Sequence, residues 1–294
     1  MIWPKKLYLV LFYIFTRTTP RFWQVFQNRC VSYFFFILWD RHRNIIQKNL
    51  SVILKCSHDD PAVRQAARRV FENYGLYLVD YVQMNRVRKY LLPEEQGIQH
   101  VQQALDNGRG AILITPHLGN WELGAFMFAM RGCPIHALSM KDSETEVQDF
   151  RDRMRSTLAV RTVHIDPDNY TTVLRLVNLL KQNQVIAMLG DRWEGGKKVE
   201  VTFFGKKVYF PAGAPALALA AQAPIIPVFT VARPGGRYLA WAEKPIEVRR
   251  IPGKNTSELI AEKTQEIALA FESSIARYPD QWYHFFDYWE RYGC

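Results

Sequence analysis

The sequence has few cysteines, and their spacing is irregular. A redox C-x-x-C motif or a zinc knuckle needs closely spaced cysteines, and neither pattern occurs among the four that are present, Cys30, Cys56, Cys133 and Cys294. A reducing, cytosol-facing location is therefore the simplest expectation, and the sequence leaves a single disulfide open.

Long hydrophobic runs are also lacking. Leu7–Phe15 is apolar but ends at a polar segment, and it falls well short of the ~20 residues that a membrane-spanning helix needs. No small-residue cleavage site follows it, which argues against a signal peptide. Without repeats, low-complexity tracts or Gly/Ser linkers, the chain is expected to form one catalytic domain over residues 49–294, preceded by an arm over residues 1–48.

Acidic residues are scarce relative to basic ones, at 28 against 38, which gives a net charge of +10. Most of this excess, and many of the aromatic residues, fall in the arm. Within it, Phe22–Trp39 is apolar but interrupted by polar residues, a pattern typical of a helix lying in a membrane interface. The alternative is a helix hairpin packed on the protein's own core. The nearly neutral remainder argues against a nucleic-acid partner.

Strand-like and helix-like segments alternate beyond the arm. Continuous apolar runs predict buried strands at 111–115, 135–139, 185–189 and 225–232. Amphipathic periodicity and capping residues predict helices at about 61–84, 121–130, 144–158, 170–182, 215–222 and 256–277. This alternation predicts an α/β fold with a largely parallel central sheet flanked by helices.

One segment combines a histidine and a carboxylate at the end of a predicted strand. His117 follows 111–115 directly, where parallel sheets usually present functional groups. Glu122 lies five residues later, so the two side chains can meet if His117 is in the loop and Glu122 is on the first helical turn. Glu122 would then fix the imidazole while its other nitrogen removes a hydroxyl proton. The alternative is a histidine that only caps the helix.

The segment from Pro116 to Glu122 resembles the H-x-x-x-x-D/E motif of glycerolipid acyltransferases, specifically the branch of lipid A late acyltransferases and phosphatidylinositol mannoside acyltransferases. Further blocks resemble that branch in the same order, across about 110–290. They are Lys141 with Asp149-Phe150, Gly190-Asp191-Arg192, Val201–Gly205, Pro211–Ala218 and Tyr278–Tyr283.

The resemblance implies an O-acyltransferase of the bacterial inner membrane, on its cytoplasmic face. It implies transfer of a fatty acyl chain from an acyl carrier protein or coenzyme A thioester to a hydroxyl of a membrane lipid such as a lipid A precursor, without a metal or a separate cofactor. His117 would be the general base and Glu122 its orienting carboxylate. Contacts with substrate are expected from Asn120, Lys141, Asp191 and Arg192.

Two other classes of function remain open at this point. One is a non-catalytic basic protein that binds membranes or nucleic acid. The other is a metal-dependent hydrolase, which would need ligands that lack any compact metal-binding spacing: His117, Glu122, His136, His164 and Asp191.

Overall fold

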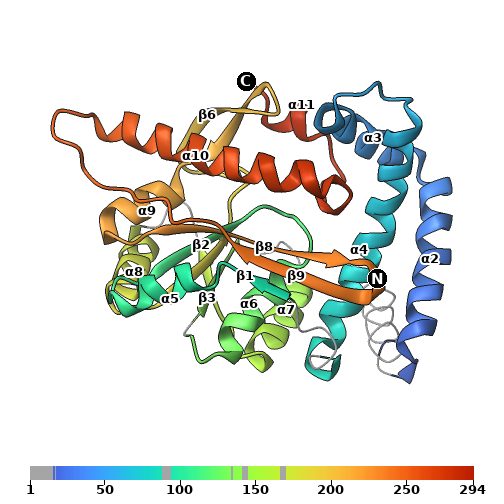
Figure 1. Ribbon diagram of the computed structural model, residues 1–294, viewed down its shortest axis with the longest axis horizontal. Helices are drawn as coiled ribbons and strands as arrows, with labels where there is room; N and C mark the ends of the chain where they lie inside the picture. Colours follow the sequence, from blue (N-terminus) through green and yellow to red (C-terminus); the bar gives the residue numbers. More distant parts are fainter. Residues whose placement is uncertain (1–15, 17, 88–93, 134, 141–144, 166–169) are drawn as a thin grey trace.

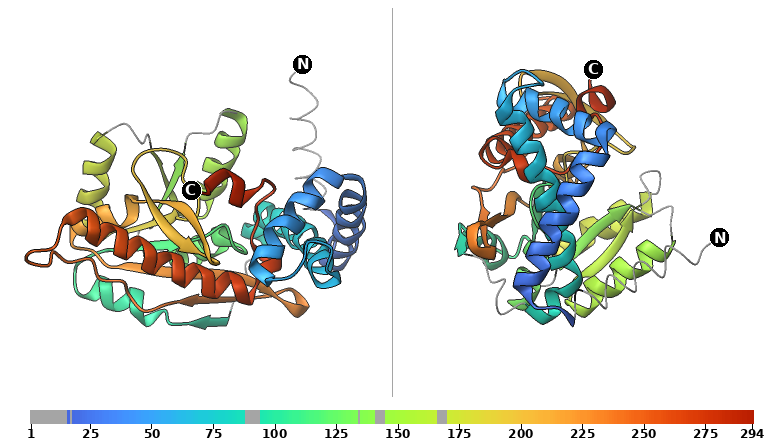
Figure 2. Two further views of the ribbon diagram at one scale, coloured as in Figure 1. Left: turned by 90° about the horizontal axis from the view of Figure 1, so that it is seen from above. Right: turned by 90° about the vertical axis from the view of Figure 1, so that its right-hand side faces the viewer.

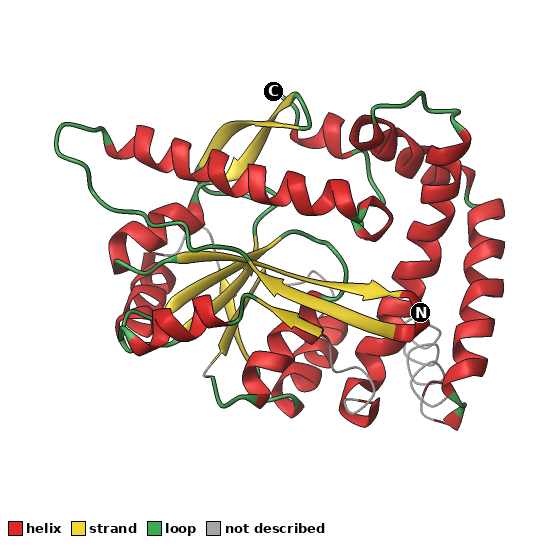
Figure 3. Ribbon diagram, viewed as in Figure 1, coloured by secondary structure: helices red, strands yellow, loops and turns green. Residues whose placement is uncertain are grey.

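The computed structural model describes residues 16, 18–87, 94–133, 135–140, 145–165 and 170–294. At its centre is a seven-stranded sheet with the order β1-β9-β8-β2-β5-β3-β4 (Figure 1). Neighbouring strands are parallel except for the pair β8 and β9, which is antiparallel. Helices cover the sheet (Figure 3), which confirms the predicted α/β fold with a largely parallel sheet.

The four predicted strands are all present, because each is a continuous apolar run buried between helices. They are β2 (Ala111–Thr115), β3 (Ile135–Met140), β5 (Val185–Leu189) and β8 (Ile225–Arg233). Three further strands were not predicted, and they complete the sheet as β1 (Glu94–Gln96), β4 (Arg161–Ile165) and β9 (Arg237–Ala242). A short 3₁₀ turn, Pro234–Gly236, joins β8 to β9 and lets the chain reverse.

Two helical layers enclose the sheet. One layer contacts the sheet through α5 (Gln99–Asp106), α6 (Trp121–Met130) and α7 (Thr145–Thr157). The other is built from α8 (Tyr170–Lys181), α9 (Gly213–Ala221) and α10 (Thr256–Arg277). The side chain of Asn255 accepts a hydrogen bond from the Ser257 amide and so caps α10, as the sequence predicts.

The C-terminal segment and a separate hairpin close one side of the domain. The hairpin pairs β6 (Lys198–Phe203) with β7 (Lys206–Pro211), and α10 packs against it. After α10, the chain forms a 3₁₀ turn, Pro279–Gln281, and then α11 (Tyr288–Tyr292). Through this path, residues near 282 reach the end of β2, where Leu118 bridges Trp282.

The arm forms α2 (Arg21–Leu38) and α3 (Asp40–Leu54), and both contact the long helix α4 (Pro61–Val87). Figures 1 and 2 show α2 and α4 side by side at one end of the sheet. The expected boundary after residue 48 falls inside α3, and the division into arm and domain remains a prediction. Of the helices within the described ranges, none has both the length and the hydropathy to cross a bilayer.

The helix α2 buries Gln24 and Ser32 together with Phe36, and it turns most of its large apolar side chains outward. Gln24 and Ser32 are buried against α4, where the Asn28 amide donates to the Glu72 carbonyl at 2.9 Å and the Ser32 hydroxyl donates to that of Phe71 at 3.2 Å. The opposite face exposes large apolar side chains, among them Phe22, Trp23, Phe26, Phe34, Ile37 and Leu38. This arrangement is the reverse of an ordinary surface helix, whose apolar stripe faces the core.

Candidate active site

His117 lies in the loop that joins β2 to α6, as the sequence predicts. The loop turns sharply at Gly119, whose φ is +64°. A Cβ at that position would lie 2.1 Å from the carbonyl oxygen of Thr230 on β8, so only glycine fits. The backbone of His117 is fixed on both sides, because its amide donates to Asp191 Oδ2 at 3.0 Å and its carbonyl accepts from the Tyr283 amide at 2.9 Å.

The carboxylate beside the imidazole belongs to Asp191. It lies two residues beyond the end of β5, the strand that pairs with β2 in parallel, with Thr115 opposite Leu189. Nδ1 of His117 lies 2.7 Å from Oδ1 of Asp191. An ionised carboxylate only accepts hydrogen bonds, so Nδ1 carries the proton and Nε2 holds the lone pair. Within the described part of the chain, that Nε2 makes no hydrogen bond.

Asp191 is completely buried but saturated with donors. Besides His117, its Oδ2 accepts from Trp282 Nε1 and from His284 Nε2, both at 3.0 Å. Burial by itself would raise the pKa of Asp191, but the electrostatic attraction of the His117 ring and the hydrogen bonds from His117 and His284 hold it well below the usual range. The carboxylate is therefore ionised at neutral pH.

The two histidines at this carboxylate stay neutral because they are buried. Burial lowers the pKa of His117 by more than Asp191 raises it. Burial also lowers the pKa of His284 to about 3. His117 keeps 15% of its side chain exposed, whereas His284 is fully buried. His117 is thus the ring that combines a free lone pair with access from outside.

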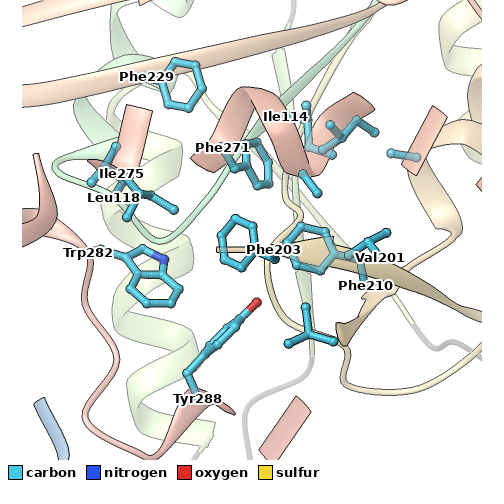
Figure 4. Close-up of a cluster of buried hydrophobic side chains, with 14 of the residues drawn as sticks. Ile114, Leu118, Val201, Phe203, Phe210, Phe229, Phe271, Ile275, Trp282 and Tyr288 are labelled. Atoms are coloured by element: carbon cyan, nitrogen blue, oxygen red, sulfur yellow. The ribbon is translucent and has the colours of Figure 1, made fainter. Parts of the chain in front are cut away.

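An aromatic cluster surrounds the far side of Asp191. Trp282 and Tyr288 pack there against Phe203 (Figure 4), and the Tyr288 hydroxyl donates to the Asp191 carbonyl at 2.7 Å. Phe203 and Phe210 are fully buried in this core. The cluster excludes water from one side of the carboxylate, which strengthens its interaction with His117.

Glu122 does not contact His117, which corrects the predicted pairing. It is on the first turn of α6, and both of its carboxylate oxygens bind the guanidinium of Arg155 from α7, at 2.6 and 3.0 Å. Only 6% of the Glu122 side chain and 8% of the Arg155 side chain are exposed. The direction of this first turn, toward α7, carries Glu122 away from the imidazole.

Three other predicted site residues are Asn120, Arg192 and Lys141, and the structure describes the first two. Asn120 is buried, and its side-chain oxygen caps α6 by accepting from the Leu123 amide at 3.0 Å. Arg192 is partly buried, and it donates to His284 Nδ1 at 3.2 Å and to the Tyr283 carbonyl at 2.8 Å. Lys141 lies outside the described residues. For these residues, contact with substrate remains a prediction.

The residues considered as metal ligands are not brought together. His136 on β3 is 3.4 Å from Gln184, and His164 on β4 is 2.9 Å from Asp152. Glu122 is bound by Arg155, so only His117 and Asp191 of the five meet. The described residues hold no group of three or more histidine, cysteine or acidic side chains arranged to bind a metal.

Sequence reasoning missed three functional neighbours: Trp282 and His284 beside Asp191, and Arg155 beside Glu122. Trp282 lies in a block that resembles the acyltransferase branch, and that position was the available signal for it. Neither its contact nor that of His284 follows from local spacing, since both residues reach Asp191 only through the path of the chain after α10.

The sequence of the chain is similar to those of known acyltransferases. A phosphatidylinositol mannoside acyltransferase of Mycolicibacterium smegmatis is 27% identical over 187 residues, which cover 63% of this chain and 59% of that protein. One of Mycobacterium tuberculosis is 26% identical over 220 residues, which cover 72% of this chain and 66% of that protein. The chain thus matches about three fifths to two thirds of the length of these relatives. Residues 2–291 match the sequence model of the bacterial lipid A biosynthesis acyltransferases, and the chain therefore belongs to that family.

Proposed function

We propose that the protein transfers a fatty acyl chain from a thioester to a hydroxyl group of a membrane lipid. The observation that carries the proposal is the short contact between His117 Nδ1 and the buried Asp191 carboxylate, with Nε2 left without a partner among the described residues. Membership of the lipid A acyltransferase family supports both the reaction type and a lipid acceptor. The acyl donor is an acyl carrier protein or coenzyme A thioester.

The chemistry needs one base and no enzyme nucleophile, since a thioester is already activated. Nε2 of His117 removes the proton of the lipid hydroxyl as its oxygen attacks the thioester carbonyl. The carbon–sulfur bond of the tetrahedral intermediate then breaks, and the imidazolium returns the proton to the departing thiolate. Asp191 keeps the proton on Nδ1 throughout and stabilises the imidazolium, a role that the sequence had suggested for Glu122.

The start of α6, which directly follows the His117 loop, can supply donors for the oxyanion of that intermediate. Asn120 donates its amide to the Thr230 carbonyl, and the Leu123 amide is taken by the Asn120 side chain. The amides of Trp121 and Glu122 are in the first turn, where no intrahelical partner exists. We assign oxyanion stabilisation to these two amides, helped by the positive end of the helix.

The inverted helix α2 supports a membrane location for the acceptor. Its outward face exposes 74% of Phe22 and 56% of Phe26, while its polar face binds α4. Such a surface is stabilised by insertion into the boundary between headgroups and acyl chains, and it needs no spanning segment. We place the protein on the cytoplasmic face of the bacterial inner membrane, with a glycolipid such as a lipid A precursor as acceptor.

Mass spectrometry of lipids tests the transfer. The full chain is expressed in a bacterial host that lacks its own late acyltransferases, beside the variants His117→Ala and His58→Ala. The control removes an exposed histidine whose ring lies beside Asp59 and not beside the site. The parent and the control are expected to yield lipids heavier by one acyl group, and His117→Ala is not. Equal yields from all three would refute the proposal.

Vesicle sedimentation tests the membrane contact separately. The double variant Phe22→Ser/Phe26→Ser should bind vesicles less than the parent, whereas Leu174→Ser/Leu269→Ser, which removes exposed apolar side chains from α8 and α10, should bind as the parent does. These substitutions are sharper than deleting the arm, since deletion would also uncover the buried polar face of α4. Unchanged sedimentation of the first variant would count against the interfacial role of α2.

A further inference from the structure

A buried polar connection leads from α2 into the domain. Arg21, the first residue of α2, binds the carboxylate of Asp80 on α4 with two of its nitrogens, and the Nη2 to Oδ2 distance is 2.9 Å. Asp80 is completely buried, while Arg21 remains partly exposed. An isolated carboxylate in that position would be costly, so Arg21 is its compensating charge.

The connection continues from Asp80 to the catalytic loop. The Tyr238 hydroxyl of β9 donates to Asp80 Oδ2 at 2.6 Å and lies 3.5 Å from Asn120 Nδ2, which donates to it. Tyr238 is buried as well. Asn120 is three residues beyond His117 and caps α6, so its amide sets where the loop ends and the helix begins.

The donor and acceptor roles in this series of hydrogen bonds can be assigned in only one way. Asp80 can only accept, so the Tyr238 proton points at it, and the Tyr238 lone pair is then free for Asn120. The Asn120 oxygen is occupied by the Leu123 amide, which turns its nitrogen toward Tyr238. The Asn120 backbone amide is held by the Thr230 carbonyl at 2.7 Å. The loop is thus anchored on one side by the sheet and on the other by the arm.

We infer that seating of α2 on α4 positions the loop that carries His117, through a connection that we call the arm–loop chain: Arg21, Asp80, Tyr238 and Asn120. If α2 leaves α4, Asp80 loses its compensating charge, and burial then favours its protonated form. Tyr238 would lose an ionised acceptor, and the Asn120 amide would lose its fixed partner. The base would be correctly placed only while the arm is seated. The inference rests on the proposed function, because it takes His117 as the base.

The position of His117 can be read without activity. The full chain, carrying ¹³C-labelled histidine rings, is prepared in detergent micelles, and the His117 ring resonance is identified by its loss in His117→Gln. Arg21→Ala and Tyr238→Phe are expected to shift this resonance, and Arg21→Lys, which keeps the charge, to shift it less. Arg29→Ala removes the same charge from an exposed position of the same helix and should leave the resonance where the parent has it. An unmoved resonance in Arg21→Ala would overturn the inference.

Kinetics supply the second readout. Thiol release from palmitoyl-coenzyme A is followed with vesicles of phosphatidylinositol and phosphatidylglycerol. Arg21→Ala and Tyr238→Phe should each lower kcat about tenfold with the KM for palmitoyl-coenzyme A unchanged, since a small displacement of a base costs rate. The double variant should be no slower than the slower single variant, because both break one connection. Multiplied effects would mean that the residues act independently and would refute the arm–loop chain. If the parent releases no thiol from this donor with these vesicles, the resonance alone decides the inference, and the lipid analysis described above decides the proposed function separately.

Discussion

Asp191 and Glu122 are two buried carboxylates that are bound to different kinds of base. Asp191 holds an imidazole, which gains and loses a proton near neutral pH, whereas Glu122 holds a guanidinium, which stays charged. The first pair can take up a proton from a substrate and then give it back. The second pair cannot exchange a proton near neutral pH, and its ion pair holds α7 against α6.

The surroundings of the two pairs differ in the same way as their chemistry. Asp191 accepts from Trp282 and His284 in addition to His117, and the ring it holds remains partly exposed. The Glu122 pair is closed off beside Tyr77 and Tyr81, and burial and the Glu122 charge raise the pKa of both phenols. A site that must meet a substrate keeps one side open, and a structural ion pair does not.

The largest effect is expected from Asp191→Asn. The amide keeps the size of the side chain but has no charge, so it neither holds the His117 proton on Nδ1 nor stabilises the imidazolium. Acyl transfer should fall about 10³- to 10⁴-fold, as for other carboxylates that orient a catalytic histidine. The rate is measured as lipid product per enzyme by mass spectrometry. A rate within tenfold of the parent would remove Asp191 from the mechanism.

Glu122→Gln should act on the fold instead of the chemistry. It leaves Arg155 charged and buried without its partner, which costs about 3–5 kcal/mol of unfolding free energy. Urea denaturation measures this loss, and Asp40→Asn, which removes an exposed carboxylate from a local ion pair, is the control. If Glu122→Gln were stable but inactive, and Asp191→Asn active, the two carboxylates would have the opposite roles, and the pairing suggested by the sequence would be restored.

The choice between these carboxylates could not be made from the sequence. Spacing favoured Glu122, five residues from His117, because only local distances can be read along a chain. The structure instead brings β5 beside β2, although β3 and β4 lie between them in sequence, and this strand order places Asp191 at the imidazole. Strand order depends on how whole helices pack against the sheet, and the periodicity of a sequence carries no information about that packing.

What the sequence did predict has a local cause. The bounds of β2 and β5 match the expected runs, because a strand covered on both faces is apolar throughout. The start of α4 at Pro61 was readable from Asp60, whose side chain accepts from the Ala62 amide at 2.8 Å. β4 was not predicted because polar side chains interrupt its apolar residues, and both β4 and β9 complete the sheet by pairing with β3 and β8.

Acid should weaken the Asp191 site through the two histidines that contact its carboxylate. The folded pKa of His284 is about 3, below its ordinary value of 6.5, so the unfolded chain binds a proton that the folded chain refuses. The contribution of His284 to the free energy of unfolding is therefore fully present above pH 6.5. It falls as the pH drops toward 3, by up to about 1.4 kcal/mol per pH unit. Burial lowers the pKa of His117, which adds a loss of the same sign.

Urea midpoints between pH 7 and pH 4.5 measure this slope, in a range above the ordinary pKa of aspartate. His284→Gln removes the titrating ring and should flatten the slope, while His58→Gln, at an exposed position, should not. A slope that is the same in His284→Gln and in the parent would mean that His284 takes up its proton in the folded state as readily as in the unfolded one.

The smallest effect is expected from Arg155→Lys. This substitution tests whether the stabilisation by the Glu122 pair depends on charge alone. Lysine keeps the charge but replaces two parallel hydrogen bonds with a single point of contact. The loss should be about 1–2 kcal/mol, the order of one charged hydrogen bond, and acyl transfer per folded molecule should match the parent. Paired urea and transfer measurements decide the matter. A variant that stays as stable as the parent but loses transfer would show that the guanidinium meets the substrate, and Glu122 and Arg155 would then belong to the reaction after all.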